Sequence, residues 1–82
     1  MSSEEVVIMD GDAIVAGMTS SKAIDSKSDL NGKVTNKGDV RIWAGEISNA
    51  DLTTAPFTVT STGNLTAHTA PLYDATFYAE NA

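Results

Sequence analysis

The sequence contains no cysteine and a single histidine, His68. Disulfides and thiolate metal sites are therefore excluded, and a structural zinc ion is not expected because it needs several nitrogen or sulfur ligands. Apolar material is also scarce, since Val, Ile, Leu and Phe together number 17 of 82 residues and aromatic residues number five. Domains this small usually need disulfides, a metal or oligomerisation for stability. The composition favours oligomerisation and indicates neither a metal nor a cofactor.

Positive charge is confined to a short part of the chain. The net charge is −6, and all five Lys and Arg residues lie between Lys22 and Arg41, together with three aspartates. Nucleic acids and anionic membranes attract clustered cations, so neither is expected as a partner. Residues 6–9 form an apolar run far too short for insertion across a bilayer, and residues 1–5 are unlike a secretory signal.

What the sequence does contain is a series of short β-type segments separated by turn residues. Alternating or β-branched runs predict strands at residues 6–9, 13–16, 39–44, 57–60 and 65–68. Asp10-Gly11-Asp12 forms a turn between the first two, and Gly17 is expected to end the second. The sequence leaves open whether these two strands pair with each other or with another chain. Residues 72–79 could form one more strand, exchanged between chains.

The middle of the chain is polar and carries turn signals. Asn31-Gly32 predicts a type I′ hairpin corner within residues 30–34, and residues 36–39 predict a second turn. A short helix from Thr19 or Ser20 to Ile24 is an alternative for part of this stretch. Residues 46–55 form a loop longer than usual, which is expected to pack against the fold or to reach a partner.

Strand alternation predicts which side chains share a face. Val40, Ile42 and Ala44 are expected on one face of strand 39–44, with Arg41 and Trp43 on the other. Across the hairpin 57–68, the residues expected to form an apolar face are Phe57, Val59 and Leu65. A single-layer sheet cannot bury such a face alone, whereas three copies packed about an axis can. The predicted fold is all-β, built from short strands and hairpins, in an intertwined homotrimer.

The chain is expected to form one β-rich module over residues 1–82. We divide it into N-terminal strands (1–18), a polar linker with turns (19–37) and a C-terminal β region (38–82).

Three blocks of the C-terminal region resemble a recurring segment of bacteriophage tail-fibre and tail-tip proteins, such as siphophage central fibres and host-specificity proteins. The blocks are GDVRIWAG at 38–45, APFTV at 55–59 and GNLTA at 63–67, and DGDAIVAGM at 10–18 is a weaker match. The resemblance implies a β-rich structural protein without catalysis, on the three-fold axis of a fibre. It also implies location in the virion tail after synthesis in the bacterial cytoplasm, with other tail proteins and a host cell-surface receptor as partners. The spacer 46–54 is longer than is usual in this pattern.

The residues expected to serve an interface or a binding surface are Arg41, Trp43, Phe57, Tyr73 and Tyr78. If Arg41 and Trp43 share a strand face, the guanidinium can lie near the indole, a cation–π contact worth about 0.5–2 kcal/mol. Trp43, Tyr73 and Tyr78 could also form a sugar-binding platform, although so few aromatic residues are expected to be needed for the core or an interface. Binding of a saccharide or protein on the host surface is therefore the alternative function.

No catalytic constellation emerges from the sequence. His68 lacks the partners of a catalytic triad, and the chain is not expected to be an enzyme. Asp10 and Asp12 supply too few oxygens for calcium, which takes six to eight, so a turn is expected there; the sequence leaves open an ion on a trimer axis, where each ligand would be present three times. Glu46 and Asp51 are not supported as a glycosidase pair, because any acidic protein offers such pairs.

Overall fold

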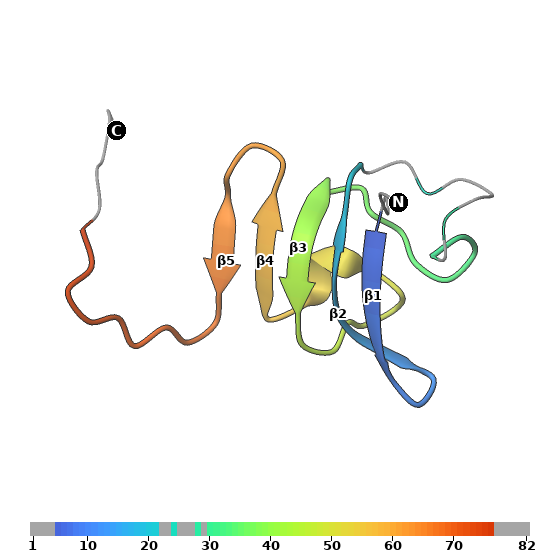
Figure 1. Ribbon diagram of the computed structural model, residues 1–82, viewed down its shortest axis with the longest axis horizontal. Helices are drawn as coiled ribbons and strands as arrows, with labels where there is room; N and C mark the ends of the chain where they lie inside the picture. The colour runs from blue at the N-terminus through green and yellow to red at the C-terminus, as the bar shows by residue number, and fades with distance from the viewer. Residues whose placement is uncertain (1–4, 22–23, 25–27, 29, 77–82) are drawn as a thin grey trace.

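The computed structural model describes residues 5–21, 24, 28 and 30–76, and within them it shows one antiparallel sheet (Figure 1). The sheet has five strands in the order β1-β2-β3-β4-β5. Its elements are β1 (Glu5–Asp10), β2 (Ala13–Thr19), β3 (Val40–Ala44), the 3-10 helix η1 (Leu52–Thr54), β4 (Phe57–Thr60) and β5 (Leu65–Ala67). The all-β fold is confirmed. In the part of the chain described, no helix is long and apolar enough to cross a membrane.

The first two strands pair with each other as an antiparallel hairpin, which answers a question the sequence left open. Gly11 takes the positive φ (62°) that the turn requires. The expected end of the second strand at Gly17 is wrong, because β2 continues through this glycine to Thr19. The reason lies in the core, where Gly17 is the register partner of Trp43.

The Asn-Gly turn forms, but not as the corner of a β-hairpin. The backbone N–H of Lys33 donates to the carbonyl of Leu30 at 2.9 Å. Gly32 has positive φ (74°) and Asn31 does not, so the turn is not type I′, which needs positive φ at both positions. The expected short helix cannot begin at Thr19, the last residue of β2, and Ser20, Ser21 and Ile24 are not helical; residues 22 and 23 lie outside the described residues.

Asn36 organises the second turn with its side chain. Its Nδ2 donates to the carbonyl oxygen of Val40 at 3.0 Å, and its Oδ1 accepts from the Val40 N–H at 2.8 Å. The Asn36 amide is buried, so it satisfies backbone groups at the start of β3 where no water reaches. The predicted turn at residues 36–39 is confirmed by the hydrogen bond from the Asp39 N–H to the Asn36 carbonyl (3.2 Å).

The long loop 46–55 packs against the chain's own sheet. Its centre is η1, where Asp51 accepts hydrogen bonds from the N–H and the hydroxyl of Thr53 at 2.9 and 2.7 Å. This cap holds Leu52 and Ala55 in the core, where both are buried. The unusual length of the loop is explained by this covering role.

The predicted hairpin of β4 and β5 is confirmed, with residues 61–64 as its loop. After β5 the chain projects away from the sheet (Figure 1). Residues 72–76 of the further strand predicted at 72–79 are not in a strand, and the rest of that stretch lies outside the described residues.

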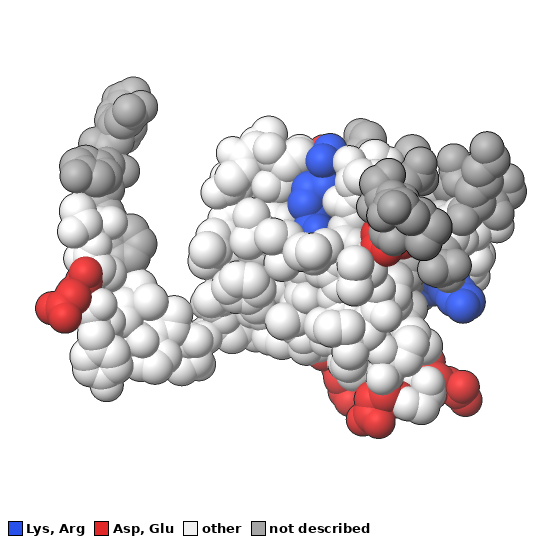
Figure 2. All heavy atoms as spheres, in the orientation of Figure 1, with Lys and Arg blue, Asp and Glu red and all other residues white. Residues whose placement is uncertain are grey.

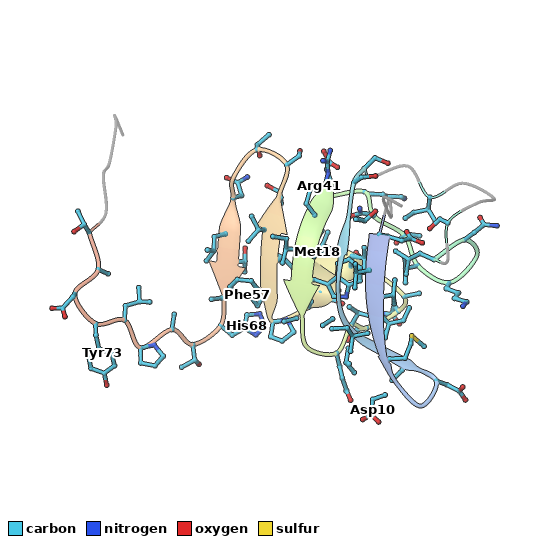
Figure 3. The ribbon with its side chains drawn as sticks, viewed as in Figure 1. Asp10, Met18, Arg41, Phe57, His68 and Tyr73 are labelled. Atoms are coloured by element: carbon cyan, nitrogen blue, oxygen red, sulfur yellow. The ribbon has the colours of Figure 1, made fainter. Side chains whose placement is uncertain are left out.

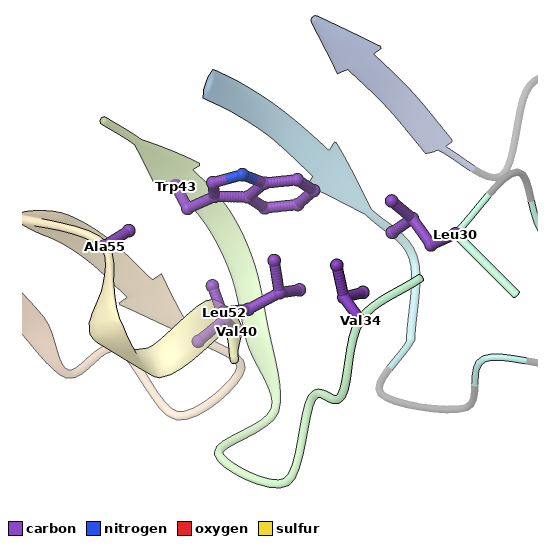
Figure 4. Close-up of a cluster of buried hydrophobic side chains, with 6 residues drawn as sticks. All are labelled: Leu30, Val34, Val40, Trp43, Leu52 and Ala55. Atoms are coloured by element: carbon purple, nitrogen blue, oxygen red, sulfur yellow. The ribbon is translucent and has the colours of Figure 1, made fainter. Parts of the chain in front are cut away.

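The hydrophobic core lies on one side of the sheet, between the strands, η1 and the segment that contains Leu30 (Figure 4). Trp43 is its largest side chain and is 1% exposed. The core consists of six buried residues: Leu30, Val34, Val40, Trp43, Leu52 and Ala55. One side of the sheet is thus covered by other segments of the same chain.

Candidate interaction surface

A β-bulge at Arg41 decides which side chains of β3 enter the core. Val40 is the register partner of Thr60 and Ile42 that of Val59, so β3 carries one extra residue between these pairs. Such an insertion breaks strict alternation. The expected grouping of Val40 with Ile42 and Ala44 is therefore wrong, since Val40 is buried and the other two are exposed.

The same bulge separates Arg41 from Trp43. The guanidinium Nε lies 3.0 Å from Asp39 Oδ1 and pairs with that carboxylate, which also accepts from the hydroxyl of Ser61. Trp43 lies in the core at 1% exposure, whereas the Arg41 side chain is 36% exposed. The expected shared face of Arg41 and Trp43 is thus corrected, and Trp43 serves the core of the single chain instead of a surface platform.

A strand glycine makes room for the indole. A Cβ added at Gly17 would lie 2.5 Å from two ring carbons of Trp43 and 2.6 Å from the carbonyl oxygen of Val6. Glycine is otherwise unfavourable inside a strand, so this close approach accounts for its presence. The indole Nε1 is buried and has no hydrogen-bond partner among the described residues, so the ring packs as an apolar body.

The uncovered side of the sheet carries two rows of apolar side chains, each crossing all five strands in register. We call the first the bulky row: Val6, Met18, Ile42, Val59 and Leu65. We call the second the alanine row: Ile8, Ala16, Ala44, Phe57 and Ala67. Together they form what we call the two-row face. Residues directly opposite on neighbouring strands touch, so each row is continuous.

The two-row face is open to solvent. Five of its seven large side chains are 41% to 62% exposed, from Ile42 to Leu65, while Phe57 and Val59 are half-buried. Among the described residues, η1 lies on the opposite side of the sheet (Figure 1). None of its ten residues is charged. In Figure 2 the visible front of the sheet carries few charged side chains, with Lys or Arg atoms in its upper middle and acidic residues beyond one end of the strands.

The structure gathers the expected interface residues only in part. Figure 3 shows Phe57 on the sheet, Arg41 near one end of β3 and Tyr73 far out on the segment after β5. Phe57 is half-buried in the two-row face, and Tyr73 is 88% exposed. Tyr78 lies outside the described residues. The expected apolar face of Phe57, Val59 and Leu65 does exist, but it is the uncovered face and not the core.

Sequence reasoning missed the contributions of β1, β2 and β3 to this face. Val6 and Ile8 alternate correctly, but they lie in the run Val6-Val7-Ile8-Met9, where every residue is apolar and no face stands out. Ile42 and Ala44 were expected on the same face as Val40, which proves to be buried, because the bulge leaves no clear signal in the sequence. The signal available in advance was confined to β2, where Ala16 and Met18 alternate with Gly17.

A second feature is a hollow of about 600 Å³ on the core side, near the β1–β2 turn. Met9, Ile14 and Ile47 supply its apolar lining, and Asp12, Lys33 and Glu46 its charged groups. These side chains offer no nucleophile–base pair. Among the described residues no three His, Asp or Glu side chains gather as metal ligands.

The carboxyl group of Asp51 has a lowered pKa, and its role is to cap η1. The side-chain and backbone hydrogen bonds from Thr53 hold the pKa of Asp51 below its usual 3.8, and Lys37 adds a smaller effect in the same direction. These donors favour the charged form. The group caps η1, so its shift reports on the loop and not on catalysis.

Comparison with known proteins gave no match to a protein-family model, to a curated protein or to a solved structure.

Proposed function

We propose that the chain is a structural component of a bacteriophage tail fibre or tail tip, and that it acts as a homotrimer in virion assembly and host attachment. The observation that carries the proposal is where the three blocks of the resemblance fall. GDVRIWAG contains β3, APFTV all of β4 except Thr60, and GNLTA contains β5; these strands are consecutive neighbours in the sheet. The blocks are thus parts of one folding unit.

The distinctive residues of these blocks have structural roles inside that unit. Trp43 and Ala55 lie in the core. Gly45 has a positive φ of 102°, and a side chain there would collide with Pro56. The pattern therefore specifies packing rather than a chemical site, which suits a structural protein. On this proposal the chain is made in the bacterial cytoplasm, is located in the tail and contacts other tail proteins.

The oligomeric state and the location test the proposal separately. Sedimentation equilibrium at micromolar concentration is expected to give three times the 8.6 kDa monomer mass. A stable monomer would contradict the proposed homotrimer. Mass spectrometry of purified phage particles whose genome encodes the chain is expected to detect it in the tail fraction. Its absence from those particles would contradict the virion assignment.

A second candidate function, binding of a host-surface saccharide or protein, is favoured by the segment after β5. Tyr73 and Leu72 are 88% and 59% exposed there. Exposed aromatic side chains are common anchors at interfaces. Binding of the labelled chain to host cells, reduced by Tyr73→Ala, would support this function, and equal binding of the wild type and the variant would argue against a role for Tyr73.

A further inference from the structure

We infer that the two-row face is the surface through which copies of this chain associate, with the bulky row of one copy packed on the alanine row of another. The inference deepens the proposed function, because it names the surface and the partner of the proposed assembly.

The face has the size of the largest apolar patch on a typical monomer. Five strands about 4.8 Å apart and two rows about 7 Å apart along the strands give a flat area of roughly 300 Å². The largest patch on a typical monomer is about 300–600 Å² and is often functional. A stable interface buries about 800 Å² per partner, so the borders of the face must contribute too. We therefore expect an assembly that dissociates on dilution.

Charge favours a second copy as the occupant. The chain carries a net charge of −6, and like charges brought together at an interface oppose association. The ten residues of the two-row face bring no charge to the contact. At its edge, Arg41 is paired with Asp39 at 3.0 Å. Two copies can meet here without placing carboxylates opposite one another.

The difference in side-chain size between the two rows makes the face of one copy complementary to the face of another. Three of the five side chains in the alanine row are alanines, while the bulky row has none. Large side chains opposite small ones fill space as a protein core does. The bulky row of one copy can lie on the alanine row of the next, and this relation can be repeated around a three-fold axis.

The absence of cysteine from the chain permits a single-thiol test with a matched control. Met18 lies in the bulky row and is 50% exposed, whereas Met9 is 44% exposed and lines the hollow on the core side of the sheet. The thiol-labelling rates of Met18→Cys and Met9→Cys are measured from nanomolar to high micromolar protein, with sedimentation of the same samples. The single tryptophan, buried Trp43, reports by its emission that each variant is folded.

The thiol at position 18 is expected to be labelled about fivefold more slowly when total protein is at ten times the dissociation constant of a two-copy contact, because mass action then leaves about a fifth of the chains free. The rate at position 9 is expected to stay unchanged. If sedimentation shows an oligomer but the labelling rate at position 18 changes with concentration no more than the rate at position 9, the two-row face is not the interface. The proposed assembly would then still stand. A monomer at every concentration would overturn both. Protection of position 18 in a monomer would show that the chain covers its own face, which also overturns the inference.

Charge substitution gives an independent measurement. Met18→Lys places an unpaired cation in the apolar contact, and is expected to weaken association tenfold or more because burying such a charge is costly. Met9→Lys makes the same change in net charge on the other side of the sheet, and is expected to leave association unaltered. Both make the chain less negative, so general repulsion cannot explain a loss confined to position 18. Equal effects of the two substitutions would overturn the inference.

Discussion

Gly17→Ala is predicted to destabilise the fold, although alanine normally stabilises a strand relative to glycine. In an unconstrained strand position the substitution would gain about 0.5–1 kcal/mol. At Gly17 the added methyl group would lie 2.5 Å from the Cη2 and Cζ2 atoms of Trp43 and 2.6 Å from the Val6 carbonyl oxygen. The indole cannot easily withdraw because it is 1% exposed within the core, and the carbonyl belongs to the paired strand β1.

The magnitude follows from overpacking. Inserting a methyl group into a packed core costs about 1–3 kcal/mol, which outweighs the propensity gain. Overpacking minus the propensity gain leaves a net loss of about 1 kcal/mol. This corresponds to a fall in Tm of roughly 4–8 °C for a domain of this size. Urea and thermal unfolding followed by Trp43 emission measure both quantities, at one protein concentration because association would add to stability.

Gly11→Ala is the matched control. Gly11 has a positive φ of 62°, but an added Cβ there meets no atom within 4 Å. This variant is expected to show only the cost of the left-handed backbone, about 1 kcal/mol, with native Trp43 emission. A neutral or stabilising Gly17→Ala would refute the argument, because the close approach to the indole would then not be the reason for glycine at this position.

Three further predictions concern the covering segments. Leu52→Ala is expected to lower the free energy of unfolding in urea by about 2–5 kcal/mol, because it empties a fully buried site. Leu65→Ala, at a position 62% exposed, is expected to leave the free energy of unfolding of the monomer nearly unchanged. Equal losses in the two variants would contradict this prediction. Asn36→Ala is expected to cost about 2–3 kcal/mol, because the buried N–H and carbonyl of Val40 lose their partners; a neutral result would mean that water replaces the amide. The lowered pKa of Asp51 means that its stabilising contribution is present above the usual 3.8 and is lost as the pH falls through the lower folded value. The stability difference between the wild type and Asp51→Asn is therefore expected to close in acid, and a difference independent of pH would contradict the capping role.

The strands could be predicted from the sequence because their turn chemistry is local. Asp10-Gly11-Asp12 and the loop 61–64 both fell between the expected strands, and β4 has the predicted bounds, residues 57–60. The error at Gly17 had a different origin. A glycine after a β-branched run signals a strand end in isolation, but here it continues the strand because a distant tryptophan requires the space. Contacts of this kind depend on residues far apart in sequence, and no local pattern contains them.

The covering layer was predicted least well, for the same physical reason. Leu30, Val34 and Leu52 lie in segments without strand or helix periodicity, yet all three are buried. They enter the core through single turns held by specific hydrogen bonds, such as those of Asp51 with Thr53. A period can be recognised over several residues, whereas an isolated apolar residue in a polar loop carries no such signal.

The bulge at Arg41 links the core to the open face. Val40 is fixed at one end by the two hydrogen bonds to the Asn36 side chain, and Trp43 at the other by the space above Gly17. Residues three apart fall on opposite faces of a regular strand, so both can be buried only if one residue is inserted between them. The insertion turns Ile42 and Ala44 outward, into register with Met18 and Ala16 of β2.

An antiparallel sheet with one solvated face normally carries polar residues on that face. Here all ten positions of the two-row face are apolar, including the two turned outward by the bulge. The bulge in β3 that buries both Val40 and Trp43 therefore also brings Ile42 and Ala44 into the two-row face. A change that removed the bulge would disturb both the core and this face. If that surface binds further copies, folding of the single chain and assembly depend on the same residue insertion in β3.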